Sequence, residues 1–235
     1  MKNFLSLTLI NLVRVPLNIL NKRGYLHQTA SFNERPVEYR FVFDQIARNA
    51  PIRVLDVGAG TTALPALIRN CGINVTAIDN IRDFWPRGMW NQHWFVLDRD
   101  ILDPKLSDSF DLITCISVLE HIKDFEKAIK EMAEILNPKG ILVLSFPYCE
   151  NTYIENVYVL AGSDAFGRKI PFICQILSRR EISDWLEKFN LSIAAQEVWQ
   201  FYSGEFWSQG TPIFPPKQVA INETHHITCL ALTKN

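Results

Sequence analysis

The stretch Val54-Leu55-Asp56-Val57-Gly58-Ala59-Gly60-Thr61-Thr62 decides the fold, because an apolar run ends there in two closely spaced glycines. A helical pattern follows directly and continues to residue 70. Glycines at positions 58 and 60 let the backbone turn sharply, and they let a ligand approach where any Cβ would intrude. The stretch therefore predicts a strand, a tight turn and a helix, with a ligand bound at the turn.

Short β-branched runs alternate with helical patterns from residue 52 onward, an order typical of a parallel sheet wound with helices. Apolar residues at helical spacing predict helices over residues 38–47 and 125–136, and Ser178 can cap a later helix. Two stretches, 147–177 and 203–224, match neither pattern; because both contain aromatic residues, Phe172 among them, we expect insertions that form ordered lids or substrate-pocket walls. The predicted strands cover residues 52–57, 74–79, 94–97, 111–117, 141–146, 191–201 and 226–233.

The composition is that of a folded soluble protein, with 235 residues of which 48% are hydrophobic and 21% charged. That length suits a single α/β domain. The net charge of -1 gives no basic footprint for nucleic acid, which is therefore not expected as a partner. The five cysteines are scattered without metal-ligand spacing, which indicates reduced thiols in a cytoplasmic protein that has no metal site.

The first 20 residues are largely apolar but make a poor signal peptide, because Arg14 and Pro16 interrupt the run and no small-residue cleavage site follows. We expect an amphipathic helical extension over residues 1–32. Within residues 1–23, cationic side chains can meet anionic headgroups at a membrane surface, or the helix can bind a partner protein. The alternative is that this helix packs on the protein's own core or on a second subunit. The cations are Lys2, Arg14, Lys22 and Arg23.

The second predicted strand ends in Asp79, 19 positions after Gly60. A carboxylate about 20 residues after such a turn can accept hydrogen bonds from both hydroxyls of a ribose. An NAD-binding domain would share these features, and Ala63 lies where a dinucleotide fingerprint has its third small residue. These residues alone predict a nucleoside site and leave the cofactor open.

Further motifs follow in order along the chain. VLDVGAGTT (54–62), AIDN (77–80), FVLDRDI (95–101), FDLITCISVLEHI (110–122) and LNPKGILVLSFP (136–147) together resemble the class I S-adenosylmethionine (SAM)-dependent methyltransferases. SRREISDWLEKFNLSI and ITCLALTK are similar to the family's late helix and final strands. The resemblance implies a Rossmann-like, doubly wound α/β fold with a seven-stranded, mostly parallel sheet and helices on both faces. It implies one methyltransferase domain over residues 33–235, with insertions near 147–177 and 203–224.

The resemblance also implies roles for individual residues in binding SAM. The turn would line the methionine part, where the following helix N-terminus favours a carboxylate. The acid after the second strand would bind the ribose, and Asp100 would accept from the adenine amino group, with Asp98 as the competitor for that role. Ile116 and Ser117, at the end of the fourth predicted strand, would lie under the cofactor. In chain order, the expected cofactor-binding residues are Asp56, Gly58, Ala59, Gly60, Asp79, Asn80, Asp100, Ile101, Ile116 and Ser117.

Glu120 and His121 are the candidate catalytic residues. Methyl transfer from a sulfonium is an in-line displacement, so a hydroxyl acceptor must be held close to the methyl carbon and must lose its proton. A histidine with a pKa near neutrality suits a general base, and the VLEH motif places His121 just beyond a strand end. The alternative is a structural role, in which His121 bonds only to the backbone or to Glu120.

The leading functional hypothesis is O-methylation of a small-molecule or glycan acceptor. Nitrogen and carbon acceptors stay open, because an amine needs little help from a base. The segment Asn33-Glu34-Arg35-Pro36-Val37-Glu38-Tyr39, which can close over SAM, is similar to small methyltransferases of polysaccharide or natural-product pathways. Two other classes are a SAM-binding module without catalysis and an NAD-dependent oxidoreductase. The latter would need a Tyr-x-x-x-Lys or an equivalent hydride-handling set, and none is evident.

Overall fold

The computed structural model describes residues 33–85, 88–168, 170 and 172–235. Its internal contacts divide the chain into Met1–Glu34 and Arg35–Asn235. The helical extension predicted for residues 1–32 lies outside the described residues, and the account that follows concerns the second unit. No helix among the residues described has both the length and the apolarity needed to cross a bilayer.

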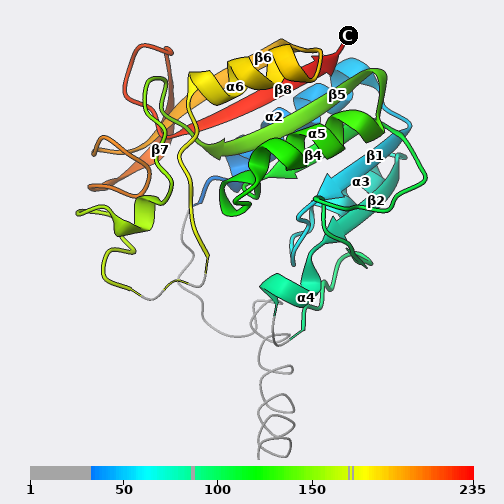
Figure 1. Ribbon diagram of the computed structural model, residues 1–235, viewed down its shortest axis with the longest axis horizontal. Helices are drawn as coiled ribbons and strands as arrows, with labels where there is room; N and C mark the ends of the chain where they lie inside the picture. Colours follow the sequence, from blue (N-terminus) through cyan, green and yellow to red (C-terminus); the bar gives the residue numbers. More distant parts are fainter. Residues whose placement is uncertain (1–32, 86–87, 169, 171) are drawn as a thin grey trace, which may run out of the picture. The chain divides into compact units, whose positions relative to one another are not determined.

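Within the described part of the chain, one sheet has eight strands in the order β3-β2-β1-β4-β5-β8-β6-β7 (Figure 1). Strands β1 to β5 are parallel, and β8 lies antiparallel between β5 and β6. The strand order reverses direction between β1 and β4, so the connections that leave the carboxyl ends of these two strands run in opposite directions along the sheet. The strands are β1 (Arg53–Val57), β2 (Asn74–Asp79), β3 (Leu97–Asp98), β4 (Phe110–Ile116), β5 (Leu136–Pro147), β6 (Leu191–Tyr202), β7 (Pro212–Val219) and β8 (Ile227–Lys234).

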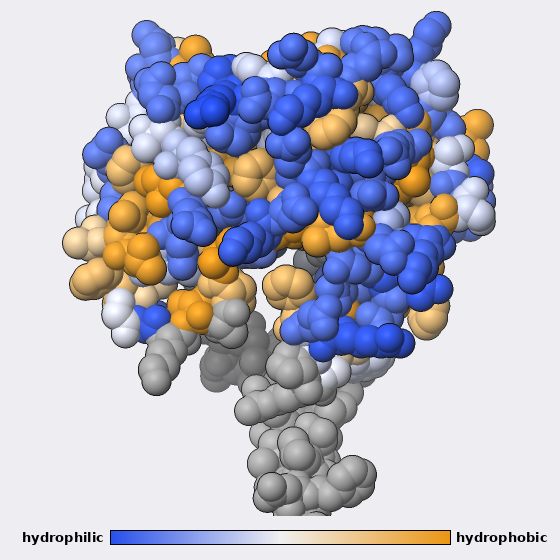
Figure 2. Space-filling view, viewed as in Figure 1, coloured by the Kyte–Doolittle hydropathy of each residue, from blue (hydrophilic) through white to orange (hydrophobic). Residues whose placement is uncertain are grey.

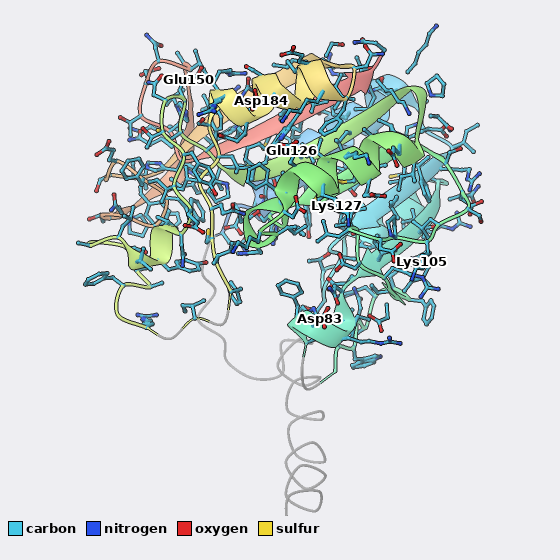
Figure 3. The ribbon with its side chains drawn as sticks, viewed as in Figure 1. Asp83, Lys105, Glu126, Lys127, Glu150 and Asp184 are labelled. Carbon is cyan, nitrogen blue, oxygen red and sulfur yellow. The ribbon has the colours of Figure 1, made fainter. Side chains whose placement is uncertain are left out.

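Helices cover both faces of the sheet, and alternate residues of the buried strands supply the two cores. Leu142 and Leu144 of β5 belong to the core under α5 and α6, whereas Val143 belongs to the core under α2 and α3. The outward surfaces of α5 and α6 are polar, as Glu126, Lys127 and Asp184 show (Figures 2 and 3). The helices are α2 (Arg35–Asn49), α3 (Leu64–Asn70), α4 (Ile81–Phe84), α5 (Phe125–Ile135) and α6 (Arg179–Lys188), with short 3-10 turns η1 (Leu119–His121) and η2 (Val157–Val159).

The start of α6 is the predicted one. Ser178 accepts from the backbone of Arg180, and Glu181 accepts from the backbone of Ser178, so the two side chains form a capping box. Ile182 and Trp185 of this helix are buried in the core, as their spacing predicts. The doubly wound α/β architecture is likewise the predicted one.

The third strand lies later than predicted, at Leu97–Asp98 instead of residues 94–97. The side chain of Asn91 accepts hydrogen bonds from the backbone N–H groups of His93 and Trp94, at 2.7 and 3.1 Å. Such local bonds stabilise a turn in competition with a strand. The β-branched and aromatic pattern before Leu97 therefore ends in a turn, not in the sheet.

The insertion at 203–224 contains β7, an eighth strand that the sequence analysis missed. Pro212, Pro215 and Pro216 lie within it, and proline cannot donate to a ladder. Because β7 pairs only with β6 at the edge of the sheet, its prolines are tolerated there. Within the stretch 147–177, described residues around η2 form a small core of their own, which includes Val157, Cys174 and Ile176.

Candidate functional site

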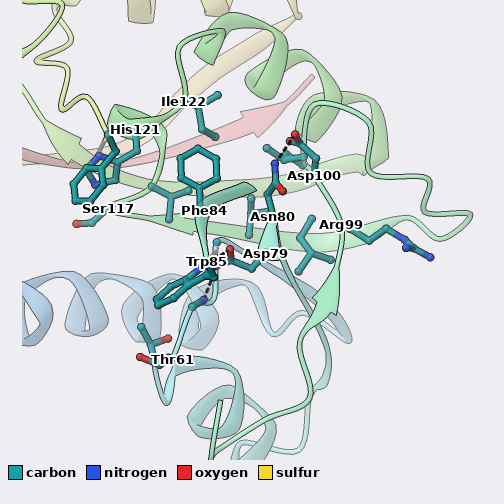
Figure 4. A pocket seen from close by; sticks show the side chains of 18 of the residues that line it. Thr61, Asp79, Asn80, Phe84, Trp85, Arg99, Asp100, Ser117, His121 and Ile122 are labelled. Carbon is teal, nitrogen blue, oxygen red and sulfur yellow. Dashed lines mark hydrogen bonds between the residues drawn. The ribbon is translucent and has the colours of Figure 1, made fainter. Parts of the chain in front are cut away.

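A cavity of about 460 Å³ opens at the carboxyl ends of β1, β2 and β4, next to the point where the strand order reverses (Figures 2 and 4). Open α/β sheets bind ligands at this place, and the volume lies within the range of about 300–1,000 Å³ for small-molecule sites. Eight of the predicted site residues line it. They are Gly58, Gly60, Asp79, Asn80, Asp100, Ile101, Ser117 and His121.

The glycine turn has the conformation that its sequence requires. Gly58 and Gly60 have φ angles of 70° and 50°, which disfavour other residues. A Cβ at Gly58 would lie only 2.4 Å from the Cγ2 atom of Val118, in the segment that follows β4. The absence of a side chain at Gly58 therefore lets two strand ends approach each other at the floor of the cavity.

Asp79, at the end of β2, faces the cavity and holds the turn. Its Oδ2 atom accepts from the backbone N–H of Gly60 at 2.8 Å, and its Oδ1 atom accepts from Nε1 of Trp85 at 3.0 Å (Figure 4). Burial raises the pKa of this carboxyl group above its ordinary value, and the two hydrogen bonds work against that rise. Asp79 is thus a half-buried acceptor fixed between the turn and the segment after α4.

Asp98 and Asp100 occupy different surroundings. Asp98 accepts from the backbone N–H of Ile81 at 3.1 Å and pairs with Arg82 at 2.9 Å, so it holds the start of α4 and does not line the cavity. Asp100 lines the cavity, where its Oδ2 atom accepts from Nδ2 of Asn80 at 2.9 Å. Of the two alternatives, the geometry therefore favours Asp100 as the residue that meets a ligand.

Arg35, at the start of α2, also lines the cavity, although the sequence analysis assigned it no contact of its own. Its guanidinium pairs with the buried carboxylate of Glu38 at 2.7 Å. Glu38 in turn accepts from the hydroxyls of Ser117 and Ser145, at 2.5 and 2.6 Å. This network joins α2 to the ends of β4 and β5, and it fixes a cation on the cavity wall.

His121, in η1, presents its imidazole to the cavity. Its Nδ1 atom lies 2.6 Å from the backbone oxygen of Ile173. Because a carbonyl oxygen can only accept, Nδ1 carries the hydrogen, and Nε2 of the neutral ring is left as an acceptor. Burial lowers the pKa of His121, the bond to Ile173 raises it, and the charge of Arg35 lowers it; the net direction is downward. The ring is therefore neutral near pH 7 and able to take a proton.

The remaining predicted site residues lie behind the cavity wall. Glu120 is buried, with its carboxylate 3.9 Å from Nε2 of His121. Ala59 and Ile116 are buried in the cores. Asp56 is buried too; it accepts from Thr114 at 2.7 Å, and its Oδ2 atom has no hydrogen-bond partner among the described residues. Burial raises the pKa of Asp56 to about 7.

Four apolar residues on the cavity wall were not predicted as individual site residues, although the aromatic residues of 147–177, Phe172 among them, were expected to line a pocket or form a lid. Val118 and Ile122 flank η1, Phe84 ends α4, and Phe172 comes from the insertion at 147–177. The ring of Phe172 packs edge-on against His121, with centroids 4.9 Å apart. Loop residues of this kind have no sequence spacing that would reveal them. Among the residues that the structure describes, no cluster of three side chains suits a metal ion.

Comparison with known proteins gives the family. A family model described as a methyltransferase domain matches residues 25–196, so the chain belongs to that family. Similar proteins include the ubiquinone biosynthesis O-methyltransferase of Coxiella burnetii, 26% identical over 169 residues, which are 67% of this chain and 70% of the relative. That of Xanthomonas oryzae is 28% identical over 155 residues, 61% of this chain and 64% of the relative.

Solved structures share the fold. The magnesium protoporphyrin IX methyltransferase of Synechocystis, crystallised with SAM, has a TM-score of 0.52 at 14% identity, covering 91% of this chain and 89% of its own. The N-methyltransferase NodS of Bradyrhizobium japonicum, crystallised with S-adenosylhomocysteine, has a TM-score of 0.51 at 18% identity, covering 86% and 87%. Family and fold confirm the predicted class, a methyltransferase that uses SAM, and decide against the NAD-dependent oxidoreductase.

Proposed function

We propose that this protein transfers a methyl group from SAM to the hydroxyl of an apolar small molecule, with His121 as the general base. The observation that carries the proposal is the orientation of His121. Its Nδ1–H is held by Ile173, which leaves Nε2 as the acceptor on the wall of the cavity.

We assign the cofactor to one end of the cavity, the nucleoside end, formed by Gly60, Asp79, Asn80 and Asp100. The glycine turn supports this assignment, because Gly58 and Gly60 line the cavity with backbone alone, at positive φ angles that other residues disfavour. Asp79 would accept from the ribose hydroxyls and Asp100 from the adenine amino group. Arg35 supplies a cation suited to the carboxylate of the methionine part.

We assign the acceptor to a second part of the cavity, the acceptor end, formed by Val118, His121, Ile122 and Phe172. Val118 borders the glycine turn, so the two parts of the cavity meet there. SAM supplies an electrophilic methyl group on a sulfonium, and this chain must orient the acceptor oxygen and remove its proton. His121 has the tautomer and the lowered pKa that suit proton removal at neutral pH. Glu120 is buried 3.9 Å from Nε2 and does not line the cavity, so we assign it no contact with the acceptor.

The walls of the acceptor end support an apolar acceptor with a planar ring over a glycan. A sugar exposes hydroxyls on every side, and each hydroxyl that is buried without a partner costs free energy. Val118, Ile122 and Phe172 offer apolar surface, and Phe172, which meets His121 edge-on at 72°, adds an aromatic ring against which a planar acceptor can pack. The relatives named O-methyltransferases support oxygen as the methylated atom.

A methyl-transfer assay tests the proposal. The full chain is incubated with SAM carrying a labelled methyl group and, in separate reactions, a catechol, a simple phenol, an aniline and a hexose. We expect label on the oxygen of the catechol or the phenol and none on the hexose. Transfer only to the hexose, or only to the aniline, would contradict the proposed acceptor class. The cofactor assignment would still hold in that case.

A further inference from the structure

The indole of Trp85 lies inside the nucleoside end of the cavity, on the residues that we assign to the cofactor. Its Nε1–H donates to Oδ1 of Asp79 at 3.0 Å (Figure 4). Its six-membered ring lies over the glycine turn, where a Cβ on Gly60 would meet the Cζ2 atom of Trp85 at 3.5 Å. One side chain therefore covers the backbone and the carboxylate that a nucleoside needs to reach.

The indole N–H matches the chemistry of a ribose hydroxyl as a donor. Both are neutral donors to a carboxylate, and Trp can donate but not accept. The other oxygen of Asp79 already accepts from the backbone N–H of Gly60 at 2.8 Å. Trp85 therefore bonds to the oxygen of Asp79 that the glycine turn does not bond to.

Holding this carboxylate matters because Asp79 is half-buried and burial raises its pKa. A buried carboxylate oxygen without a hydrogen-bond donor is unfavourable, because it has lost its water and gained no partner in exchange. An internal donor removes that cost in the free protein, and a ligand that replaces the donor gains correspondingly less. The bond from Trp85 thus lowers the net binding free energy that a cofactor gains from its own bond to Asp79.

We propose that Trp85 is an internal placeholder for the ribose: its N–H occupies Asp79 in the free protein and is displaced when the nucleoside binds. This inference rests on the proposed cofactor site. It makes Trp85 an affinity-determining residue, which keeps cofactor and product binding weaker than the site alone would give. The role favours release of S-adenosylhomocysteine, because the indole returns as the product leaves.

Calorimetric titration with S-adenosylhomocysteine tests the inference in three proteins: wild type, Trp85→Phe and Trp90→Phe. Phe at position 85 keeps an aromatic ring and removes only the donor. Trp90 is the matched control, because it follows on the same segment, is exposed and does not line the cavity. We expect Trp85→Phe to bind about tenfold more tightly, the order for one net hydrogen bond to a charged group. Trp90→Phe should stay within about twofold of wild type.

A second measurement keeps the inference testable if Trp85→Phe folds poorly. In wild-type protein with ¹⁵N-labelled tryptophan, the Nε1–H resonance of Trp85 should shift on addition of S-adenosylhomocysteine. Unchanged or weaker binding by Trp85→Phe, or an unmoved resonance in a wild-type protein that binds the ligand, overturns the placeholder role alone. Failure of both wild type and Trp85→Phe to bind overturns the proposed cofactor site and this inference with it.

Discussion

The two ends of the cavity are built in different ways. At the nucleoside end, Asp79 and Asp100 follow adjacent strands, and each carboxylate is fixed by hydrogen bonds from neighbouring groups. At the acceptor end, Val118, Ile122 and Phe172 come from segments outside the strands and surround a single titratable ring. On the assignments proposed above, the sheet would position the polar contacts for the cofactor, whereas loop packing would select the acceptor.

The largest expected effect is at the acceptor end. His121→Ala should reduce kcat/KM for methyl transfer about 100- to 10,000-fold, the usual cost of losing a general base. Affinity for S-adenosylhomocysteine should stay within about threefold, because His121 is not part of the nucleoside end. Steady-state kinetics measures the effect on turnover, and calorimetry on the same preparation measures the effect on affinity. Turnover at the wild-type rate would leave His121 with a structural role only.

At the nucleoside end, Asp79→Asn should weaken binding of S-adenosylhomocysteine about 100-fold, because a charged acceptor for the ribose hydroxyls becomes a neutral amide. The matched control is Asp103→Asn, which alters an exposed carboxylate paired with Lys105 outside the cavity. Calorimetric titration of both variants checks the prediction. Equal affinities for the two variants would remove Asp79 from the cofactor site.

A smaller effect distinguishes the two acids after β3. Asp100→Ala should weaken binding of S-adenosylhomocysteine about tenfold, through loss of one charge-assisted hydrogen bond. Asp98→Ala should weaken it less, because Asp98 bonds to Ile81 and Arg82. The reverse order, measured by the same titration, would assign the adenine contact to Asp98.

A separate effect is expected on stability, which leaves ligand binding and turnover aside, at the buried acid Asp56. Burial raises the pKa of Asp56 to about 7 from an ordinary 3.8, so the folded state holds this proton more tightly than the unfolded state. Between these pKa values stability falls as pH rises, by about 2–3 kcal/mol from pH 5 to pH 8. The free energy of unfolding is measured with denaturant at pH 5 and pH 8 in wild type and in Asp56→Asn. The decrease between the two pH values should be smaller in the variant by about 2–3 kcal/mol. An identical dependence in both proteins would argue against this titration.

The sequence predicts most of the nucleoside end because its residues stand at fixed offsets from recognisable strands. Gly58, Gly60 and Asp79 follow β-branched runs whose carboxyl ends must meet at one edge of a parallel sheet. Asp98 and Asp100 could not be separated from sequence, since both follow the same strand. The bond from Asp98 to Ile81, which assigns it to α4, exists only in three dimensions.

Other parts of the molecule could not be predicted, for physical reasons that differ. Strand β7 contains three prolines, and only its position at the sheet edge makes them tolerable. Phe172 reaches His121 from a segment 51 positions later in the chain, and no periodic pattern encodes such a contact. Arg35 is held on the cavity wall by Glu38 and the serines it binds, a network visible only once α2 is packed.

The most direct test of the central claim is calorimetric titration of the wild-type chain with S-adenosylhomocysteine and, separately, with NAD. The geometry of the glycine turn, Asp79 and Asp100 predicts a single site with micromolar affinity for S-adenosylhomocysteine and no measurable binding of NAD. Heat on addition of NAD, with none for S-adenosylhomocysteine, would contradict the account.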